Sequence, residues 1–165
     1  LEEFNGAKSW SLVLTFEGIG LLIGSVIGLK IKLKYPLRFL LFISFSISLY
    51  MWSMAKPQSI WFIAFCALLW GMTIDLWTKI WSTAMAREVT REALSRVSSF
   101  DALGSLIFKP IGLAIAAPAS SLIGLDNVVY VLVGISILAI SLPLLSADVR
   151  NMSYEDSPND KVALR

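Results

Sequence analysis

The sequence predicts an all-α, polytopic membrane protein built as a bundle of about five transmembrane helices. Of its 165 residues, 56% are hydrophobic and 16% are charged, whereas ordinary soluble domains have about 45–50% apolar and about 25% charged residues. Long stretches also lack any Asp, Glu, Lys or Arg, and each approaches the length at which a helix crosses a bilayer core of about 30 Å. These stretches are residues 39–55, 57–74, 110–125 and 127–147.

Five hydrophobic segments follow one another along the chain. Their apolar residues run continuously instead of alternating, which favours helices over the strands of a membrane barrel. Most of the connections are short and contain Pro or Gly, where a helix is expected to stop. We expect residues 1–9 to form an external stub and residues 146–165 a polar, disordered cytoplasmic tail. The expected spans are residues 10–29, 39–54, 59–81, 97–122 and 127–145.

The connection between the third and fourth spans is longer and charged, and it reads STAMAREVTREALSRVSS. Arg87 and Arg91 are four residues apart, as are Glu88 and Glu92, so each pair shares one face of a helix. The pattern predicts a short amphipathic helix lying on the membrane surface or, alternatively, a solvated helical linker.

The basic residues predict the orientation of the chain, because short cytoplasmic loops retain Lys and Arg. Ten of the 14 basic residues fall on one side of the predicted membrane and two on the other. The C-terminus should therefore be cytoplasmic, in a multi-pass protein of the cell membrane. With an external N-terminus, no signal segment and Leu1 at the first position, we expect further helices upstream; a processed chain that lacks none is the alternative.

The composition also limits the chemistry. The chain has no His, the commonest general base and metal ligand, and its one cysteine, Cys66, cannot form an internal disulfide. We therefore expect no enzyme, no metal and no cofactor. The net charge of +2 is dispersed, so the lipid bilayer is a more natural partner than nucleic acid.

Four ionisable side chains fall within the predicted membrane depth, in the first, third and fourth spans; they are Glu17, Asp75, Asp101 and Lys109, and Lys79 lies near the end of the third span. Such residues cost about 2.5–3.5 kcal/mol on insertion scales and therefore face a protein interior or a wet cavity. These three spans are expected to face inward and the second and fifth to face lipid. Glu17 and Lys109 fall at similar depths and could meet, as a functional site or as a static ion pair. Asp75 and Lys79 should pair locally, and Asp101 should lie near a helix N-terminus, where negative charge is favourable.

Helix packing and bending are also predicted. Pro110 and Pro118 each remove a backbone donor from the fourth span and should kink or loosen it. Trp70 and Trp77 lie deeper than the other tryptophans and either line a cavity or simply pack. Three glycines spaced four apart in the first span would let two helix backbones approach closely. They are Gly20, Gly24 and Gly28.

The segments REVTREALSRVSSFDALGSL and KPIGLAIAAP, together with WSLVLTFEGIGLLIGSVIG and the basic loop ending in YPLR, resemble a known family. They are similar to the carboxyl-terminal half of a major facilitator superfamily transporter, most of all to enterobactin exporter-like and macrolide efflux-like permeases. The resemblance covers about residues 10–150 and implies helices eight to twelve of a twelve-helix protein. It implies a central cavity lined by the first, third and fourth spans. The loop pattern of the superfamily is degenerate here, because Gly28 and the basic residues remain without an acidic residue.

The resulting hypothesis is a part of a secondary active transporter, a permease or antiporter for proton-coupled efflux of a small amphiphilic molecule of the drug or siderophore type. Glu17 would accept the proton, and Lys109 would be its partner or an anion contact. Asp75, Lys79 and Asp101 would serve structure or gating on the inner side. The expected partners are the missing N-terminal transporter half and the small-molecule substrate.

Two alternatives remain open at this point. The chain could be a noncatalytic membrane interaction or assembly subunit whose glycines dock a partner helix. A weaker alternative is an intramembrane aspartyl hydrolase that uses Asp75 and Asp101. Seven further hydrophobic segments upstream would favour the transporter, and a start codon just before Leu1 would favour the subunit.

Overall fold

The computed structural model describes residues 6–31, 35–55 and 59–146, without the side chains of Arg87, Glu88 and Arg91. All the regular structure in these ranges is helical, and each of the five helices is long and apolar enough to cross a membrane. The prediction of an all-α chain with about five membrane-crossing segments is therefore confirmed. The helices are α1 (Ala7–Lys30), α2 (Pro36–Ala55), α3 (Ile60–Glu88), α4 (Arg91–Ile123) and α5 (Leu125–Leu145).

The charged connection between α3 and α4 is not a separate helix. α3 continues to Glu88 instead of ending near residue 81, and α4 already begins at Arg91, so only Val89 and Thr90 join them. The predicted surface helix is wrong because hydropathy marks only the part of a helix that lies in hydrocarbon. Ala, Glu and Arg are good helix formers, and they extend both helices beyond that part. Arg87, Glu88 and Arg91, for which shared helix faces were predicted, lie outside the described side chains.

The connection between α4 and α5 is a single residue. Gly124 ends α4 and precedes α5 with a φ of 84°, a backbone conformation that glycine adopts without the penalty a Cβ would bring. α4 runs through Pro110 and Pro118 without ending, over 33 residues. At about 1.5 Å per residue this helix is about 50 Å long, which exceeds a bilayer core of about 30 Å.

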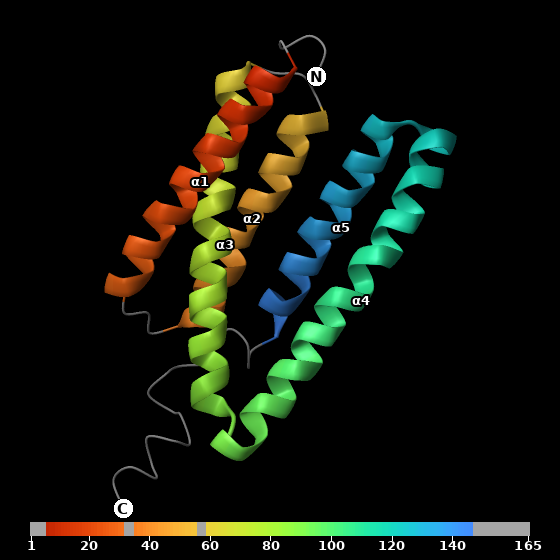
Figure 1. Ribbon diagram of the computed structural model, residues 1–165. Helices are drawn as coiled ribbons and strands as arrows, with labels where there is room; N and C mark the ends of the chain where they lie inside the picture. The colour runs from red at the N-terminus through yellow and green to blue at the C-terminus, as the bar shows by residue number, and fades with distance from the viewer. Residues whose placement is uncertain (1–5, 32–34, 56–58, 147–165) are drawn as a thin grey trace, which may run out of the picture.

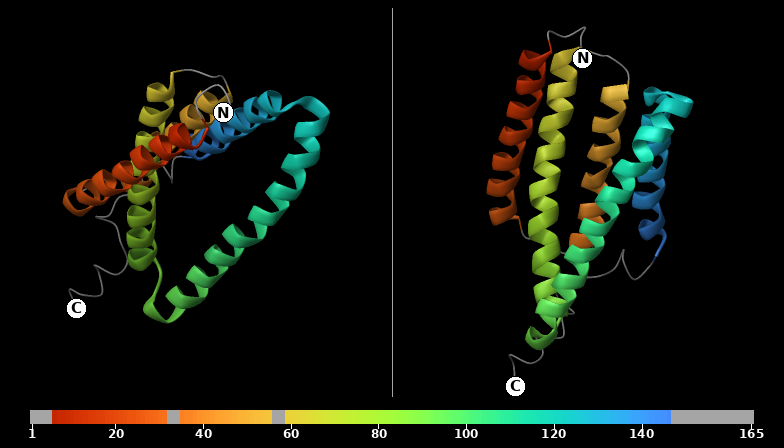
Figure 2. Two further views of the ribbon diagram at one scale, coloured as in Figure 1. Left: turned by 45° about the horizontal axis from the view of Figure 1, so that its top comes forward. Right: turned by 45° about the vertical axis from the view of Figure 1, so that its right-hand side comes forward.

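α3 is the central helix of the bundle. α1 packs along it, α2 packs against both α3 and α5, and α4 and α5 form a hairpin (Figure 1). α4 meets α3 at their shared end and leans away from it over the rest of its length (Figure 2). The buried residues gather around α3 in two small clusters. One contains Val13, Ile63 and Ala67, and the other contains Leu40, Leu76 and Ile80.

The expected division into inward-facing and lipid-facing helices is not found. α2 and α5, which were expected to face lipid, pack against each other, and α2 also packs on α3. α4, which was expected to face inward with α1 and α3, has no buried residue in its described part. The prediction considered only ionisable residues, whereas the hydroxyl groups of α2 and α5 also form polar contacts between helices.

Candidate functional site

α1 and α3 touch backbone to backbone. A Cβ at Gly20 or Gly24 would collide with the backbone of α3, and at Gly24 it would lie 2.7 Å from the Met72 carbonyl oxygen. Gly71 of α3 makes the reciprocal contact with α1, because a Cβ there would collide with the backbone carbonyl group of Glu17. The glycines therefore allow a close approach that any larger residue would prevent. Sequence reasoning missed Gly71, since a single glycine among large residues has no spacing pattern.

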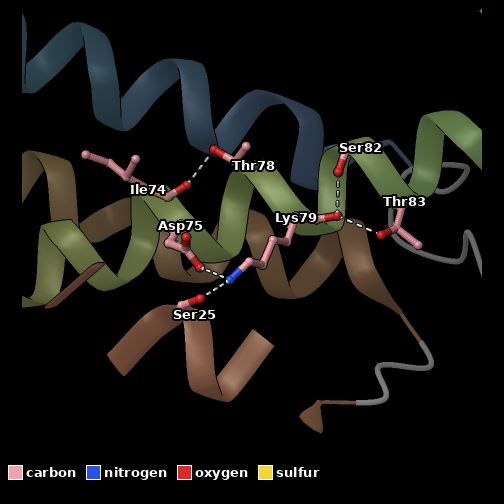
Figure 3. Close-up of polar contacts among 7 residues, drawn as sticks. All are labelled: Ser25, Ile74, Asp75, Thr78, Lys79, Ser82 and Thr83. Carbon is pink, nitrogen blue, oxygen red and sulfur yellow. Dashed lines mark hydrogen bonds and ion pairs between the residues drawn. The ribbon is translucent and has the colours of Figure 1, made fainter. Parts of the chain in front are cut away.

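A polar contact reinforces this interface further along the two helices. The Lys79 ammonium lies 2.6 Å from Asp75 Oδ2 and donates a second hydrogen bond of 2.6 Å to Ser25 Oγ on α1 (Figure 3). Gly28 leaves room for the lysine, because a Cβ there would lie 3.1 Å from Lys79 Cδ. The carboxylate and the ammonium neutralise each other, and the bond to Ser25 extends the pair across to α1.

Glu17 lies on the same interface but has no such partner. Its carboxyl group is half-buried and makes no hydrogen bond or ion pair within the described part of the chain. Tyr50 of α2 packs against the cluster that contains Val13, which lies one helical turn before Glu17, and it interacts electrostatically with Glu17. Glu17 is therefore an acid at membrane depth whose charge no described basic side chain balances.

The structure does not bring Glu17 and Lys109 together. α1 packs along α3, whereas Lys109 is exposed on α4, on the opposite side of the bundle (Figures 1 and 2). Lys109 borders an apolar groove of about 600 Å³ between α4 and α5, and it makes no hydrogen bond or ion pair with any described residue. The predicted meeting is wrong because equal depth in the membrane does not determine which helices are neighbours.

Asp101 is held differently from the way its sequence position predicts. Because α4 begins at Arg91, Asp101 lies beyond the first turn, and the predicted interaction with a helix N-terminus is wrong. Its Oδ2 atom instead accepts a 3.3 Å hydrogen bond from the indole N–H of Trp81. Trp81 stacks on Trp77 with ring centroids 5.2 Å apart and ring planes inclined by 26°. Asp101 thus joins α4 to a pair of stacked tryptophans on α3.

A cavity of about 390 Å³ lies between α2, α3 and α5. Its apolar lining includes both deep tryptophans, Trp70 and Trp77, so these side chains border a cavity as well as packing. Next to it, two hydroxyl pairs connect the helices: Ser46 with Thr73 at 2.7 Å and Ser48 with Ser136 at 2.8 Å. Its polar lining consists of Ser44, Thr73, Thr78 and Ser136.

Among the described residues, no group of acidic or cysteine side chains is placed to hold a metal ion. No protein-family model, curated protein or solved structure matches the chain.

Proposed function

We propose that the chain is part of a secondary active transporter of the major facilitator type that exports a small amphiphilic molecule in exchange for protons. The observation that carries the proposal is the isolation of Glu17. This half-buried acid at membrane depth has no described hydrogen bond or ion pair, whereas Asp75 on the facing helix is paired with Lys79. Ionisable groups at membrane depth mark proton and substrate pathways in transport proteins.

Glu17 is well placed to convert proton uptake into movement of helices. Its backbone carbonyl group lies against Gly71, so the residue belongs to the stretch where α1 and α3 approach closely. Protonation removes a charge that hydrocarbon disfavours and no described cation balances, whereas loss of the proton restores that charge. The two protonation states therefore favour different environments for this stretch of α1, and this difference is what proton coupling requires.

The proposal includes a partner for the exposed side of α4. In a complete transporter, the preceding half would pack against this bundle, in a bacterial cell membrane with the C-terminus in the cytoplasm. The exposure of α4 along its described length, with Lys109 unpaired, supports such a partner. The substrate would be a drug-like or siderophore-like amphiphile.

Two alternatives receive less support from the geometry. An assembly subunit that docks a partner through Gly20 and Gly24 would need these glycines to be free, but α3 already occupies them. An aspartyl hydrolase would need its two carboxyl groups to share a water molecule or a proton. Asp75 is instead paired with Lys79, and Asp101 accepts a hydrogen bond from Trp81.

The test is export of ethidium, a permanent amphiphilic cation, from bacterial cells that express the chain together with the coding sequence preceding it. We expect E17Q to abolish export driven by the proton gradient, because a glutamine side chain cannot take up and release a proton. The matched control is E92Q, which makes the same change at an exposed position in the first turn of α4. It should leave export unchanged, and a protonophore should stop export in both the control and the unmodified protein.

Protonophore-sensitive export that persists in E17Q would contradict the proposed role of Glu17. Failure of the unmodified protein to export ethidium would contradict the proposed efflux of amphiphiles. Equal loss of export in E17Q and E92Q would show a general effect of removing carboxylates and would also contradict the assignment.

A further inference from the structure

We infer that the cavity between α2, α3 and α5 is a binding site for a protonated amine with an apolar body. Its use in transport would rest on the proposed function, but the binding itself would not. The inference starts from the polar atoms that line the cavity and from the aromatic rings beside them.

The size and lining of the cavity suit a small, largely apolar molecule. A volume of about 390 Å³ lies within the range of small-molecule sites, which are mostly apolar with a few placed polar groups. Trp70 and Trp77 form part of the wall on α3, and Ile47 and Ile140 form part of it on α2 and α5. The body of the ligand is therefore expected to be aromatic or aliphatic.

The hydroxyl groups of the lining have already used their protons. Each donates to a carbonyl oxygen in the preceding turn of its own helix, at 2.7 Å for Ser44, 2.9 Å for Thr78 and 2.8 Å for Ser136. Thr73 lies 3.0 Å from the Leu69 carbonyl oxygen in its own helix and 3.3 Å from the Ile43 carbonyl oxygen of α2, and its one proton is shared between these acceptors. A hydroxyl group has one proton and two lone pairs, so Ser44 and Thr78 keep the capacity to accept, whereas Thr73 and Ser136 each already share a hydrogen bond with a second hydroxyl group. A hydrogen-bond donor on the ligand therefore matches the oxygen atoms of Ser44 and Thr78.

The charge around the cavity favours a cation. None of the described lining residues is basic, and Trp77 offers an aromatic ring of the kind that attracts cations. The ring of Trp77 stacks on that of Trp81, whose indole N–H donates to the carboxylate of Asp101. Negative charge thus lies at the end of the tryptophan stack.

These two requirements together define an ammonium group. It supplies N–H donors for the free lone pairs and a positive charge for the aromatic face. A carboxylate ligand would meet neither requirement. A lipid acyl chain would occupy the cavity next to its apolar lining but would make no hydrogen bond to the hydroxyl oxygen atoms.

The experiment measures binding to the protein in lipid nanodiscs by titration calorimetry, with empty nanodiscs as the reference. Three probes share one apolar body: naphthylmethylammonium, its trimethylammonium analogue, which keeps the charge but has no N–H, and naphthylacetate, which is an anion. We expect the primary ammonium to bind most tightly, the trimethyl analogue roughly tenfold more weakly and the anion no more than to empty discs.

Two substitutions on α3 test the two halves of the inference. T78V removes an acceptor and should weaken binding of the primary ammonium roughly tenfold, while binding of the trimethyl analogue stays unchanged. W77L should weaken both cations roughly tenfold. The control T83V removes a hydroxyl group that makes the same type of bond within α3, and W61L removes an exposed tryptophan; both residues lie outside the cavity lining. Both controls should bind the probes like the unmodified protein.

Anion binding as tight as that of the ammonium, or unchanged affinities in T78V and W77L, would overturn the inference. Uptake of the ammonium no greater than by empty discs would mean that lipid fills the cavity, which would also overturn it. E17Q separates this inference from the proposed function, because it should bind the ammonium normally while losing coupled export. Proton-coupled ethidium export without ammonium binding would contradict only the binding site.

Discussion

The α1–α3 pair and the α4–α5 hairpin show two ways of placing charged and small residues in a membrane helix. On α1 and α3, the glycines lie against a neighbouring backbone, and Lys79 is paired with Asp75. On α4, no atom outside the local helix lies within 4 Å of where a Cβ would stand at Gly104 or Gly112, and Lys109 is exposed. Glycines and a lysine therefore have close neighbours within the chain on α1 and α3, whereas the glycines of α4 have open space beside them and its lysine is exposed.

This difference shows where the bundle is complete and where it offers a surface. Membrane helices associate through close packing and hydrogen bonds, since lipid is as apolar as their side chains. α1 and α3 have both kinds of contact, and neither helix needs a further partner for its glycines. On α4, Lys109, Gly104 and Gly112 lie open, so an additional helix could pack closely against these glycines and pair with the lysine.

The largest effect is expected at Gly71. G71A places a methyl group against the carbonyl of Glu17 and should destabilise the bundle by roughly 3 kcal/mol, because two backbones must move apart. The control is G104A, where the surrounding space is empty and alanine favours the helix by up to about 1 kcal/mol. In thermal unfolding in detergent, G71A should lower the melting temperature of the protein and G104A should raise it. If G71A is as stable as G104A, the close contact of α1 and α3 does not hold the bundle together.

The second effect concerns the exposed lysine of α4. A lysine at the centre of a span costs about 2.5–3.5 kcal/mol on insertion scales, and snorkelling towards the interface lowers this cost. K109L should therefore raise the fraction of α4 that inserts, as measured with glycosylation sites on either side of it. R96L, nearer the start of the helix, should change this fraction much less. A decrease in insertion for K109L would show that the lysine is paired within the chain and would remove the contrast.

The sequence predicted the features that depend on one helix and missed those that depend on two. Long runs without charge revealed α2 to α5, a hydrophobic segment around Glu17 revealed α1, and the four-residue spacing of Asp75 and Lys79 anticipated their ion pair. Which helix meets the glycines of α1 is not encoded in their spacing, so Gly71 and the neighbourhood of Glu17 could not be found. The cavity was missed because its polar lining consists of hydroxyl groups, which barely change the hydropathy of a span. Only Trp70 and Trp77 pointed towards it, by their depth.

A smaller effect is expected at the ion pair of Asp75 and Lys79 on α3. D75N leaves the Lys79 charge unbalanced, and K79M leaves the Asp75 carboxylate unbalanced, so each change should lower stability. Both side chains are partly exposed, at 24% for Asp75 and 33% for Lys79, so solvent screening reduces the coupling between them to about 1 kcal/mol. A double-mutant cycle with D75N and K79M, measured by unfolding in detergent, gives this coupling directly. A coupling of zero would show that the bond from Lys79 to Ser25, rather than the pair, is what matters there.

The smallest effect is expected where the two regions are joined. Ser48 of α2 is buried and lies 2.8 Å from Ser136 of α5, which itself donates to a carbonyl oxygen of its own helix. This bond connects α2, which packs on α3, to the hairpin that contains α4. Hydrogen bonds between membrane helices contribute about 0.6 kcal/mol on average, so a cycle with S48A and S136A should give a coupling of that size. The cycle with S53A and S136A is the control, because Ser53 is also buried in α2 but bonds to Tyr50 of its own helix and to Cys66 of α3, and not to α5. Equal coupling in the two cycles would mean that α5 is held to α2 by packing alone, and the hairpin would then be free to shift against α2 without breaking a specific bond.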